Sequence, residues 1–278
     1  MSAGVINHAI ARGLRKLVRA GLGEFVIALR RALRDRWRTR NWVTGRLAEL
    51  RGNRVMLRGV MLHFDNPHIS TTLKSLFVSG AYEEEEATAI VELLPRDVPV
   101  IELGACIGFI ACLTNRLLLA RTKHVVVEAN SQLLPTLEKN RDDNGCAFSI
   151  VHAALAYGSE TIDFPVHANF YSSGFGRQSH QVQRVSVVSV RTLLERFGFD
   201  RATLIVDIEG AEASMVQNEL EVLRDRVGLL FIEIHDYILG PSTAADLVRR
   251  LTDAGFETIY HSKCQYVFRN RVVVSAGA

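Results

Sequence analysis

Short apolar runs alternate with amphipathic segments along most of the chain. Seven runs are typical of strands, at residues 100–102, 124–127, 147–151, 203–208, 229–234, 257–260 and 265–269. Apolar residues at helical spacing fall between them, at residues 109–119, 133–141, 191–197 and 243–254. Strands that alternate with helices predict an α/β fold, a mostly parallel seven-stranded sheet with helices on both faces. The last two strands follow each other closely, which suits an antiparallel edge strand.

Two further regions add elements to this alternation. Before it, residues 54–63 predict a strand or a hairpin, and residues 82–94 predict a helix with an acidic first turn, as the helix dipole favours. Within it, residues 161–166 and 184–190 alternate like a hairpin and enclose a polar loop at residues 169–176. A long loop at the rim of an α/β sheet often binds substrate.

The first strand of the sheet leads into a glycine turn that suits a ligand. Glu102 closes the strand, and Gly104, Ala105 and Gly108 lie in the turn before the next helix. Glycines let the backbone approach a ligand closely, and the helix presents free N–H groups. The second strand ends in another acid, Glu128, which is well placed to bind both hydroxyls of a ribose. The pattern predicts a pocket for a nucleoside-bearing cofactor; the alternative is a tight turn that binds nothing.

The charge at this turn distinguishes between cofactors. Dinucleotide folds use three closely spaced glycines, so that a pyrophosphate can lie against the helix N-terminus, and this turn lacks that triplet. A carboxylate at Glu102 would repel a pyrophosphate but attract an ammonium group. S-adenosylmethionine carries an ammonium and a sulfonium and no phosphate. The sequence therefore favours S-adenosylmethionine over a nicotinamide dinucleotide.

Acidic residues and a histidine gather where the fourth and fifth strands end. Asp207, Glu209 and Glu212 follow the fourth strand, and Glu233 and His235 the fifth. Because the carboxyl ends of parallel strands share one rim, these groups could deprotonate a hydroxyl or hold a cation. Asp207, Glu209 and His235 are our catalytic candidates. Glu212 would equally suit a helix N-terminus, and His235 could be a hydrogen-bonded histidine with no catalytic role.

Composition adds an asymmetry of charge. The chain has 278 residues, 48% of them apolar, which is enough for one large domain and an appendage. Its four cysteines form no Cys-x-x-Cys pair and no zinc pattern with histidine, so no metal site is predicted. The net charge is +3, yet the first 54 residues hold 13 basic and 3 acidic residues, against 20 and 27 in the rest. The chain therefore divides into a basic arm (1–54), a connecting region (55–97) and a cofactor-binding domain (98–278).

The basic arm predicts an amphipathic helix. Apolar residues recur at helical spacing from residue 6 to residue 33, with arginines between them and helix-weakening glycines at 21 and 23. The arm could pack on the domain or lie on an anionic membrane. Its low serine content disfavours a transit peptide, and its few aromatic residues make nucleic-acid binding the weaker alternative. Because no run is long enough to span a bilayer, we expect a cytoplasmic protein, with peripheral contact at the inner membrane face as an option.

Several motifs resemble the FkbM-type family of S-adenosylmethionine-dependent methyltransferases, over roughly residues 77–269. The most specific is residues 206–212, which are similar to the family's Asp-x-Glu-Gly-Ala-Glu signature. Supporting segments are residues 82–83, 102–108, 128–130 and 233–235. The resemblance implies the Rossmann-like class I methyltransferase fold and methylation, mostly of hydroxyls on sugars or secondary metabolites.

The same resemblance implies roles for individual residues. Glu102, Gly104 and Gly108 would hold the methionine part of the cofactor and Glu128 its ribose, while Asp207 and Glu209 would face the transfer site. Tyr82, Glu83, Ala105 and Ala129 complete the predicted cofactor contacts; a solvated helix start is the alternative for Glu83. The chain departs from the family at Glu102, where Asp is usual, at Cys106, where Asn is common, and after Glu128, where a proline is usual.

The sequence thus predicts a methyltransferase acting on a hydroxyl of a glycan, a lipid-linked acceptor such as a glycolipid, or a small metabolite. Asp207 or His235 would take the acceptor proton as the bond forms. Two alternatives remain open: a nicotinamide-dependent oxidoreductase on a similar sheet, and a non-catalytic membrane adaptor that keeps a vestigial cofactor pocket.

Overall fold

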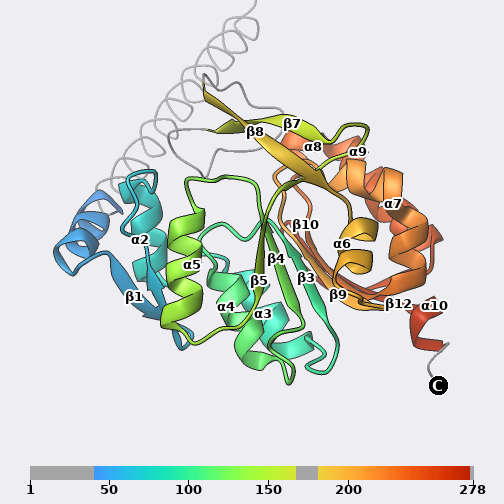
Figure 1. Ribbon diagram of the computed structural model, residues 1–278, viewed down its shortest axis with the longest axis horizontal. Coiled ribbons are helices and arrows are strands. Elements are labelled where there is room, and N and C mark those ends of the chain that lie inside the picture. Colours follow the sequence, from blue (N-terminus) through green and yellow to red (C-terminus); the bar gives the residue numbers. More distant parts are fainter. Residues whose placement is uncertain (1–40, 167–180, 276–278) are drawn as a thin grey trace, which may run out of the picture.

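The computed structural model describes residues 41–166 and 181–275. The predicted arm helix up to residue 33 and the polar loop of residues 169–176 lie outside these ranges. The central strands are β3 (Val100–Leu103), β4 (His124–Glu128), β5 (Ser149–His152), β9 (Ala202–Val206), β10 (Val227–Glu233), β11 (Phe256–Ser262) and β12 (Gln265–Asn270). They form one sheet in the order β11-β12-β10-β9-β3-β4-β5 (Figure 1). The prediction of seven strands is confirmed.

Strand directions follow the prediction closely. β3 pairs in parallel with both β4 and β9, β4 pairs in parallel with β5, and β9 with β10. β12 pairs antiparallel with β10 and with β11. The one antiparallel strand therefore lies one place inside the edge, and β11 is outermost. Chain order reverses at β3, which has β4 on one side and β9 on the other. Ligands of open α/β sheets bind outside the carboxyl ends at such a reversal.

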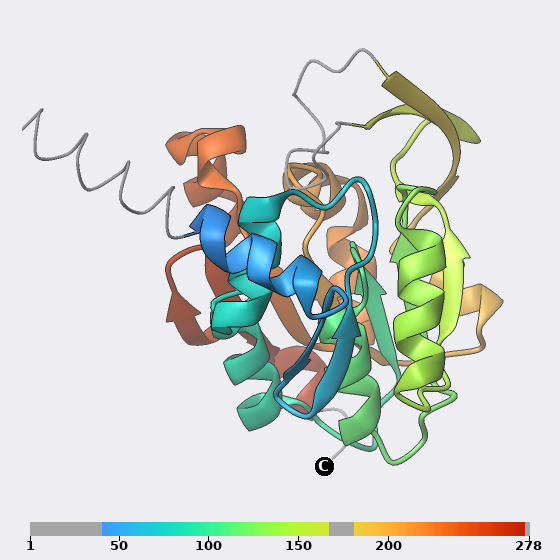
Figure 2. The same cartoon turned by 90° about the vertical axis from the view of Figure 1, so that its left-hand side faces the viewer.

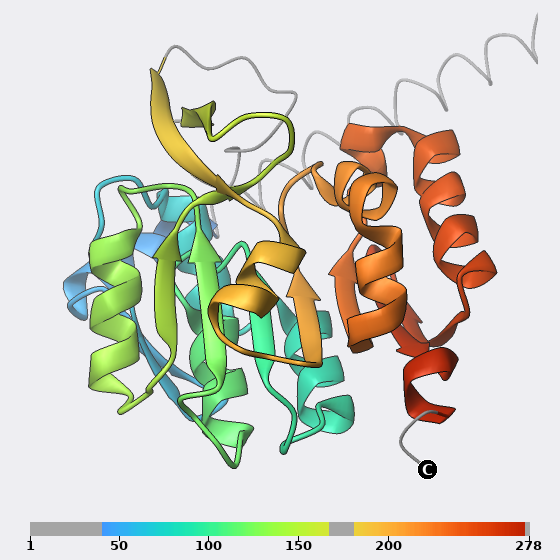
Figure 3. The same ribbon diagram turned by 45° about the vertical axis from the view of Figure 1, so that its right-hand side comes forward.

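Helices cover both faces of the sheet. On one face lie α3 (Glu84–Leu93), α4 (Phe109–Leu117) and α5 (Leu134–Asp143), and on the other α6 (Val190–Arg196), α7 (Glu212–Arg226) and α9 (Pro241–Asp253) (Figures 1 and 3). Side chains alternate along a strand. Val100 therefore packs on the face covered by α3, α4 and α5, and Ile101 packs on the face covered by α6, α7 and α9. Glu102 consequently points towards α3 and α4.

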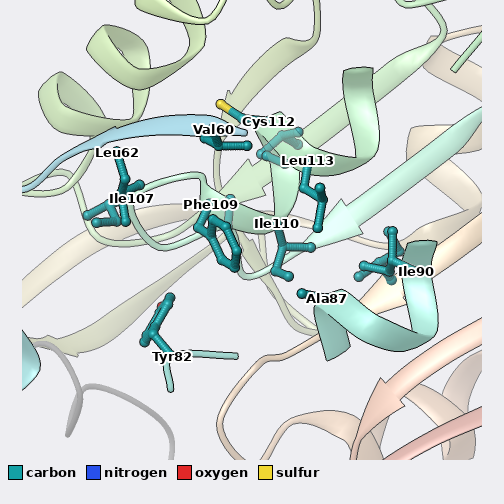
Figure 4. Packing of buried hydrophobic residues seen from close by; sticks show 14 of the residues in the cluster. Val60, Leu62, Tyr82, Ala87, Ile90, Ile107, Phe109, Ile110, Cys112 and Leu113 are labelled. Carbon is teal, nitrogen blue, oxygen red and sulfur yellow. The ribbon is translucent and has the colours of Figure 1, made fainter. Parts of the chain in front are cut away.

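A small hairpin adds a layer outside α4 and α5. The hairpin, predicted as one of two options for residues 54–63, consists of β1 (Arg54–Leu57) and β2 (Val60–His63), paired antiparallel (Figure 2). Figure 4 shows Val60 and Leu62 beside Phe109 and Leu113, all within one buried cluster. The helix that carries the glycine turn is therefore enclosed on both sides.

Some elements were not predicted. They are α2 (Thr71–Ser79), α7, the short helices α8 (Asp236–Leu239) and α10 (Arg271–Ser275), and strand β6 (Ala154–Leu155). The expected hairpin of β7 (Thr161–Val166) and β8 (Gln181–Val188) forms, and β6 joins it as a third strand. The apolar spacing of α7 is interrupted by Glu219, a buried carboxylate that accepts N–H bonds from Val190 and Arg191 at the start of α6.

The residues before the hairpin also form a helix, at 41–50. Gly45 lies against α2, where a Cβ atom would come within 2.1 Å of the backbone oxygen of Thr71. No helix within the described ranges combines the length and the apolar character needed to cross a bilayer.

One buried side chain connects the hairpin, α5 and the glycine turn. Asn140 is fully buried, and its amide donates to the backbone oxygens of His63 (2.9 Å) and Ile107 (2.8 Å). Its side-chain oxygen accepts from the backbone N–H of His63 at 2.7 Å. Since Ile107 belongs to the turn, Asn140 fixes the turn's position relative to the outer layer.

We expect Asn140→Ala to lower the free energy of unfolding by about 3 kcal/mol, because it leaves three backbone groups without partners in a buried site. Urea denaturation measures this. Asn218→Ala, on the exposed side of α7, should change stability by less than about 0.5 kcal/mol. Equal effects of the two substitutions would contradict the assigned role of Asn140.

Candidate functional site

A cavity of about 370 Å³ opens at the carboxyl ends of β3, β4, β9 and β10, within the size range of small-molecule sites. Most of the predicted site residues line it: Tyr82, Glu83, Gly104, Glu128, Ala129, Asp207, Glu209 and His235. Glu102 and Ala105 line a much smaller pocket alongside. This pocket shares five lining residues with the cavity: Glu83, Glu86, Leu103, Gly104 and Asp207. Gly108 lines neither.

The two glycines of the turn differ in what a Cβ atom would meet. Gly104 has φ +89°, and a Cβ atom there would lie 1.7 Å from the backbone oxygen of Asp207. Glycine is required because the ends of β3 and β9 meet at this point. Gly108 has φ +85°, and its Cβ would lie 2.5 Å from Leu137 of α5. The left-handed φ therefore accounts for Gly108, whereas at Gly104 a backbone oxygen excludes any Cβ atom and the bare backbone shapes the cavity floor.

Glu128 binds the turn directly. Its two carboxylate oxygens accept the backbone N–H groups of Cys106 and Asn130, each at 2.7 Å. Burial raises the pKa of Glu128 to about 7, although these hydrogen bonds act in the opposite direction. A carboxylate has about four lone-pair sites, so both oxygens can still accept a hydroxyl from the cavity.

Glu102 is held inside the protein rather than at the cavity wall. It is 2% exposed, and its Oε2 lies 3.4 Å from Nε2 of His124. Burial raises the pKa of Glu102 to about 8 and lowers that of His124 to about 3. Both side chains are therefore mainly neutral at pH 7, and Glu102 is a carboxyl group that an approaching cation would ionise.

Four carboxyl groups surround the small pocket beside Gly104. Glu83, Glu86, Glu102 and Asp207 line a space of about 10 Å³, which admits one water-sized group. Removal from water raises the pKa of Glu83 to about 8 and those of Glu86 and Asp207 well above their usual values, and mutual repulsion adds to the effect. One oxygen each of Glu86, Glu102 and Asp207 has no hydrogen-bond partner. That of Glu102 lies 3.4 Å from Nε2 of His124, and that of Asp207 lies 3.4 Å from Nε2 of His235. The arrangement suits a small cation.

His235 has four carboxylates around it, one of which is Asp207. Its Nδ1 donates to Glu212 at 2.7 Å. Its Nε2 lies 3.4 Å from Asp207, 3.7 Å from Glu209 and 3.8 Å from Glu233. Burial lowers the pKa of His235, but the hydrogen bond and the nearby negative charges outweigh it and raise the pKa to about 9. His235 is thus a cation at neutral pH.

Backbone strain is concentrated around the cavity. Four non-glycine residues that line it have left-handed φ: Glu83 (+48°), Cys106 (+52°), Glu209 (+47°) and Lys263 (+54°). Such conformations cost of order 1–3 kcal/mol each and persist where the surrounding structure enforces them. Their concentration at one cavity marks it as the candidate functional site.

Sequence reasoning missed several lining residues. Glu86 looked like part of a solvated helix start, but it is 4% exposed and faces Glu102. The signal was its spacing, because Glu86 lies one helical turn after Glu83. Lys263 and Cys264 come from the turn between the last two strands, which carried no motif. The cysteines within the described ranges are all free thiols.

Comparison with known proteins gives one family. A family model described as the methyltransferase FkbM domain matches residues 102–258, more than half of the chain. None of the curated proteins compared with the chain matches it.

Solved structures similar to the chain are distant in sequence. A protein of the NADB-Rossmann superfamily from Streptococcus agalactiae has 11% identity, with 67% of this chain and 68% of that chain covered and a TM-score of 0.41. A precorrin-6y methyltransferase from Geobacter metallireducens has 13% identity, coverages of 66% and 85%, and a TM-score of 0.40. Aeropyrum pernix fibrillarin, solved with natively bound S-adenosylmethionine, has 12% identity, with 67% of this chain and 73% of that chain covered and a TM-score of 0.39. At these values the likeness concerns the fold alone.

We expect Gly104→Ala to abolish cofactor binding, because the added Cβ overlaps a backbone oxygen and the turn must move. Isothermal titration with S-adenosylmethionine measures this. Gly158→Ala is the matched control, since Gly158 has φ +85° with nothing within 4 Å of its Cβ position. The control should lose about 1 kcal/mol of stability and keep its affinity. Unchanged affinity in Gly104→Ala would show that the turn does not form the site.

Proposed function

We propose that this chain, which belongs to the methyltransferase FkbM domain family, methylates a hydroxyl oxygen of a glycan, a glycolipid or a small metabolite. S-adenosylmethionine is the methyl donor of the family, and the family assignment decides against the nicotinamide-dependent alternative. The acceptor class and the roles of individual residues are our proposal.

The observation that carries the proposal is the set of carboxyl groups around a water-sized space beside the cavity. An ammonium group is about as large as water, and in this space it would lie among four carboxyl groups and give a partner to the unpaired oxygen of Glu86. Glu128, at the end of the neighbouring strand, then lies on the side where a ribose would bind. Between them, the bare backbone at Gly104 lets the cofactor approach the floor of the cavity.

When bound, S-adenosylmethionine supplies a methyl group on a sulfonium sulfur, which an acceptor oxygen can displace in line. The protein then has to orient the acceptor and remove its proton. His235 is a poor base because it is already protonated at neutral pH. We therefore assign proton removal to Glu209, whose carboxylate accepts a hydrogen bond from Tyr237 at 3.2 Å and lines the same cavity.

The outer wall of the cavity supports a sugar-like acceptor. Phe164 and Leu155 form an apolar side, and Tyr237, 63% exposed, lies at the rim. Aromatic faces combined with carboxylates suit a ring that has apolar faces and hydroxyl edges. Lys263, paired with Glu85, borders the same opening.

The test is methyl transfer from labelled S-adenosylmethionine to monosaccharides, glycolipids and polyols. We expect a base-stable methyl ether as product and a fall in kcat of about 100-fold in Glu209→Gln, as for loss of a general base, with cofactor affinity unchanged. Glu221→Gln, on the exposed side of α7, is the control. Full turnover in Glu209→Gln would remove its assigned role, and a base-labile or amine-linked product would remove the hydroxyl acceptor. A chain that binds the cofactor but methylates nothing would favour the non-catalytic adaptor.

We also infer that the helix of residues 41–50 contacts an anionic membrane surface. Its buried side carries Asn41, Gly45 and Ala48. Its other side exposes Trp42 (56%), Val43 (45%), Leu47 (47%) and Leu50 (84%). An apolar helix face beside a strongly basic segment suits a bilayer with anionic headgroups, and such a surface would present lipid-linked acceptors.

Co-sedimentation of the full chain with vesicles tests this contact. We expect binding to vesicles with anionic lipid, little binding to purely zwitterionic ones, and a loss of at least about tenfold in Leu47→Asp/Leu50→Asp, because two apolar side chains no longer enter the interface. Leu119→Asp, at an equally exposed loop position (78%), should bind as the unmodified chain does. Equal binding by all three proteins would refute the contact.

A further inference from the structure

Three donor groups converge at the ends of β9 and β10. One ligand atom each from Asp207, Glu233 and His235 lies within 4.8 Å of the other two. His235 is 2% exposed, and it lines the cavity. Its Nε2 faces Asp207 at 3.4 Å and Glu233 at 3.8 Å, with Glu209 at 3.7 Å beside them, and all three separations are longer than a hydrogen bond.

The other nitrogen of this histidine is fixed. Nδ1 donates to Glu212, whose side chain is fully buried and also accepts the backbone N–H of Gly210 at 3.2 Å. A carboxylate that holds one ring nitrogen while the other faces further donors is the usual outer arrangement around a metal-binding histidine. A buried oxygen of Asp207, the one nearest Nε2, has no hydrogen-bond partner. This unpaired oxygen and the oriented imidazole point into the same space.

We propose that Asp207, Glu233 and His235 bind a divalent transition-metal ion that coordinates the acceptor hydroxyl, an inference that rests on the proposed function. Metal–ligand bonds of about 2.1 Å place neighbouring ligand atoms about 3.0–3.4 Å apart. The separations of 3.4 and 3.8 Å need only a small contraction to reach that range. A mixed carboxylate and imidazole set suits Mn²⁺ and related first-row ions, and the ion takes the place of the Nε2 proton.

The ion acidifies the acceptor. An alcohol is too weak an acid to ionise near neutral pH, and coordination to a divalent cation lowers its pKa. The acceptor O–H bond breaks with its proton passing to Glu209, and the oxygen's electron pair forms the new bond to the methyl carbon. The carbon–sulfur bond breaks with its pair returning to sulfur. A ring with two adjacent hydroxyls can occupy two open coordination positions, which narrows the acceptor class to vicinal diols.

The experiment is titration of the full-length chain with Mn²⁺ alone, in which electron paramagnetic resonance measures the free ion. We expect one ion to bind per chain. The affinity for Mn²⁺ should fall by more than about tenfold in His235→Gln and in Glu233→Gln. It should fall by about tenfold in Glu212→Gln, because that variant loses the carboxylate that orients His235. Asp236→Asn is the control, because it removes an exposed carboxylate next to His235 that lies outside the cluster. It should bind as the unmodified chain does.

A second readout needs no variant. Bound Mn²⁺ broadens nearby nuclear resonances, so the imidazole signals of His235 should disappear before those of His63, which lies against Asp143 at the C-terminal end of α5. Simultaneous loss of both, absence of binding at millimolar Mn²⁺, or unchanged affinity in His235→Gln would overturn the metal site. Titration with S-adenosylmethionine on the same samples separates the two proposals. Cofactor binding without Mn²⁺ binding rejects the metal site alone, whereas failure of cofactor binding rejects the proposed function.

Discussion

The structure depends on a cluster of buried acidic side chains at the carboxyl ends of β3 and β9. Glu83, Glu86, Glu102 and Asp207 surround one small space, and no lysine or arginine within the described ranges pairs with Glu83, Glu86 or Glu102. An isolated buried carboxylate costs several kcal/mol. The acids avoid this cost by holding protons at raised pKa. We infer that a cation entering the pocket displaces these protons, so that acids that are neutral in the free protein become the carboxylates that bind the donor.

The rest of the fold holds these acids in place. The alternation of side chains along β3 sends Glu102 towards α3, where Glu86 also points, while Asp207 follows β9 across the bare backbone of Gly104. Left-handed residues at Glu83 and Glu209 turn the chain sharply at both ends of the site. Such strain persists because two extensive apolar layers, one on each face of the sheet, stabilise the surrounding elements.

Much of this arrangement was predictable from the sequence. Acids at the ends of parallel strands share one rim, so Glu128, Asp207 and His235 could be placed together without a structure. The direction of Glu102 was harder, because it depends on which face of the sheet α3 covers. Glu86 was missed because an acidic helix start is normally solvated. The long helix α7 was missed because its buried Glu219 breaks the apolar pattern, since that carboxylate binds backbone N–H groups at the start of α6.

The most direct test of the central claim is calorimetry of S-adenosylmethionine binding between about pH 6 and pH 7.5, where the donor's own α-amino group stays largely protonated. Glu102 and Glu83 have pKa values of about 8 in the free protein and Glu128 about 7, and a bound cation lowers them. Binding should therefore release protons, seen as heat that varies with the ionisation enthalpy of the buffer, and affinity should rise with pH. Binding without proton release, or affinity that falls as pH rises, would contradict the account.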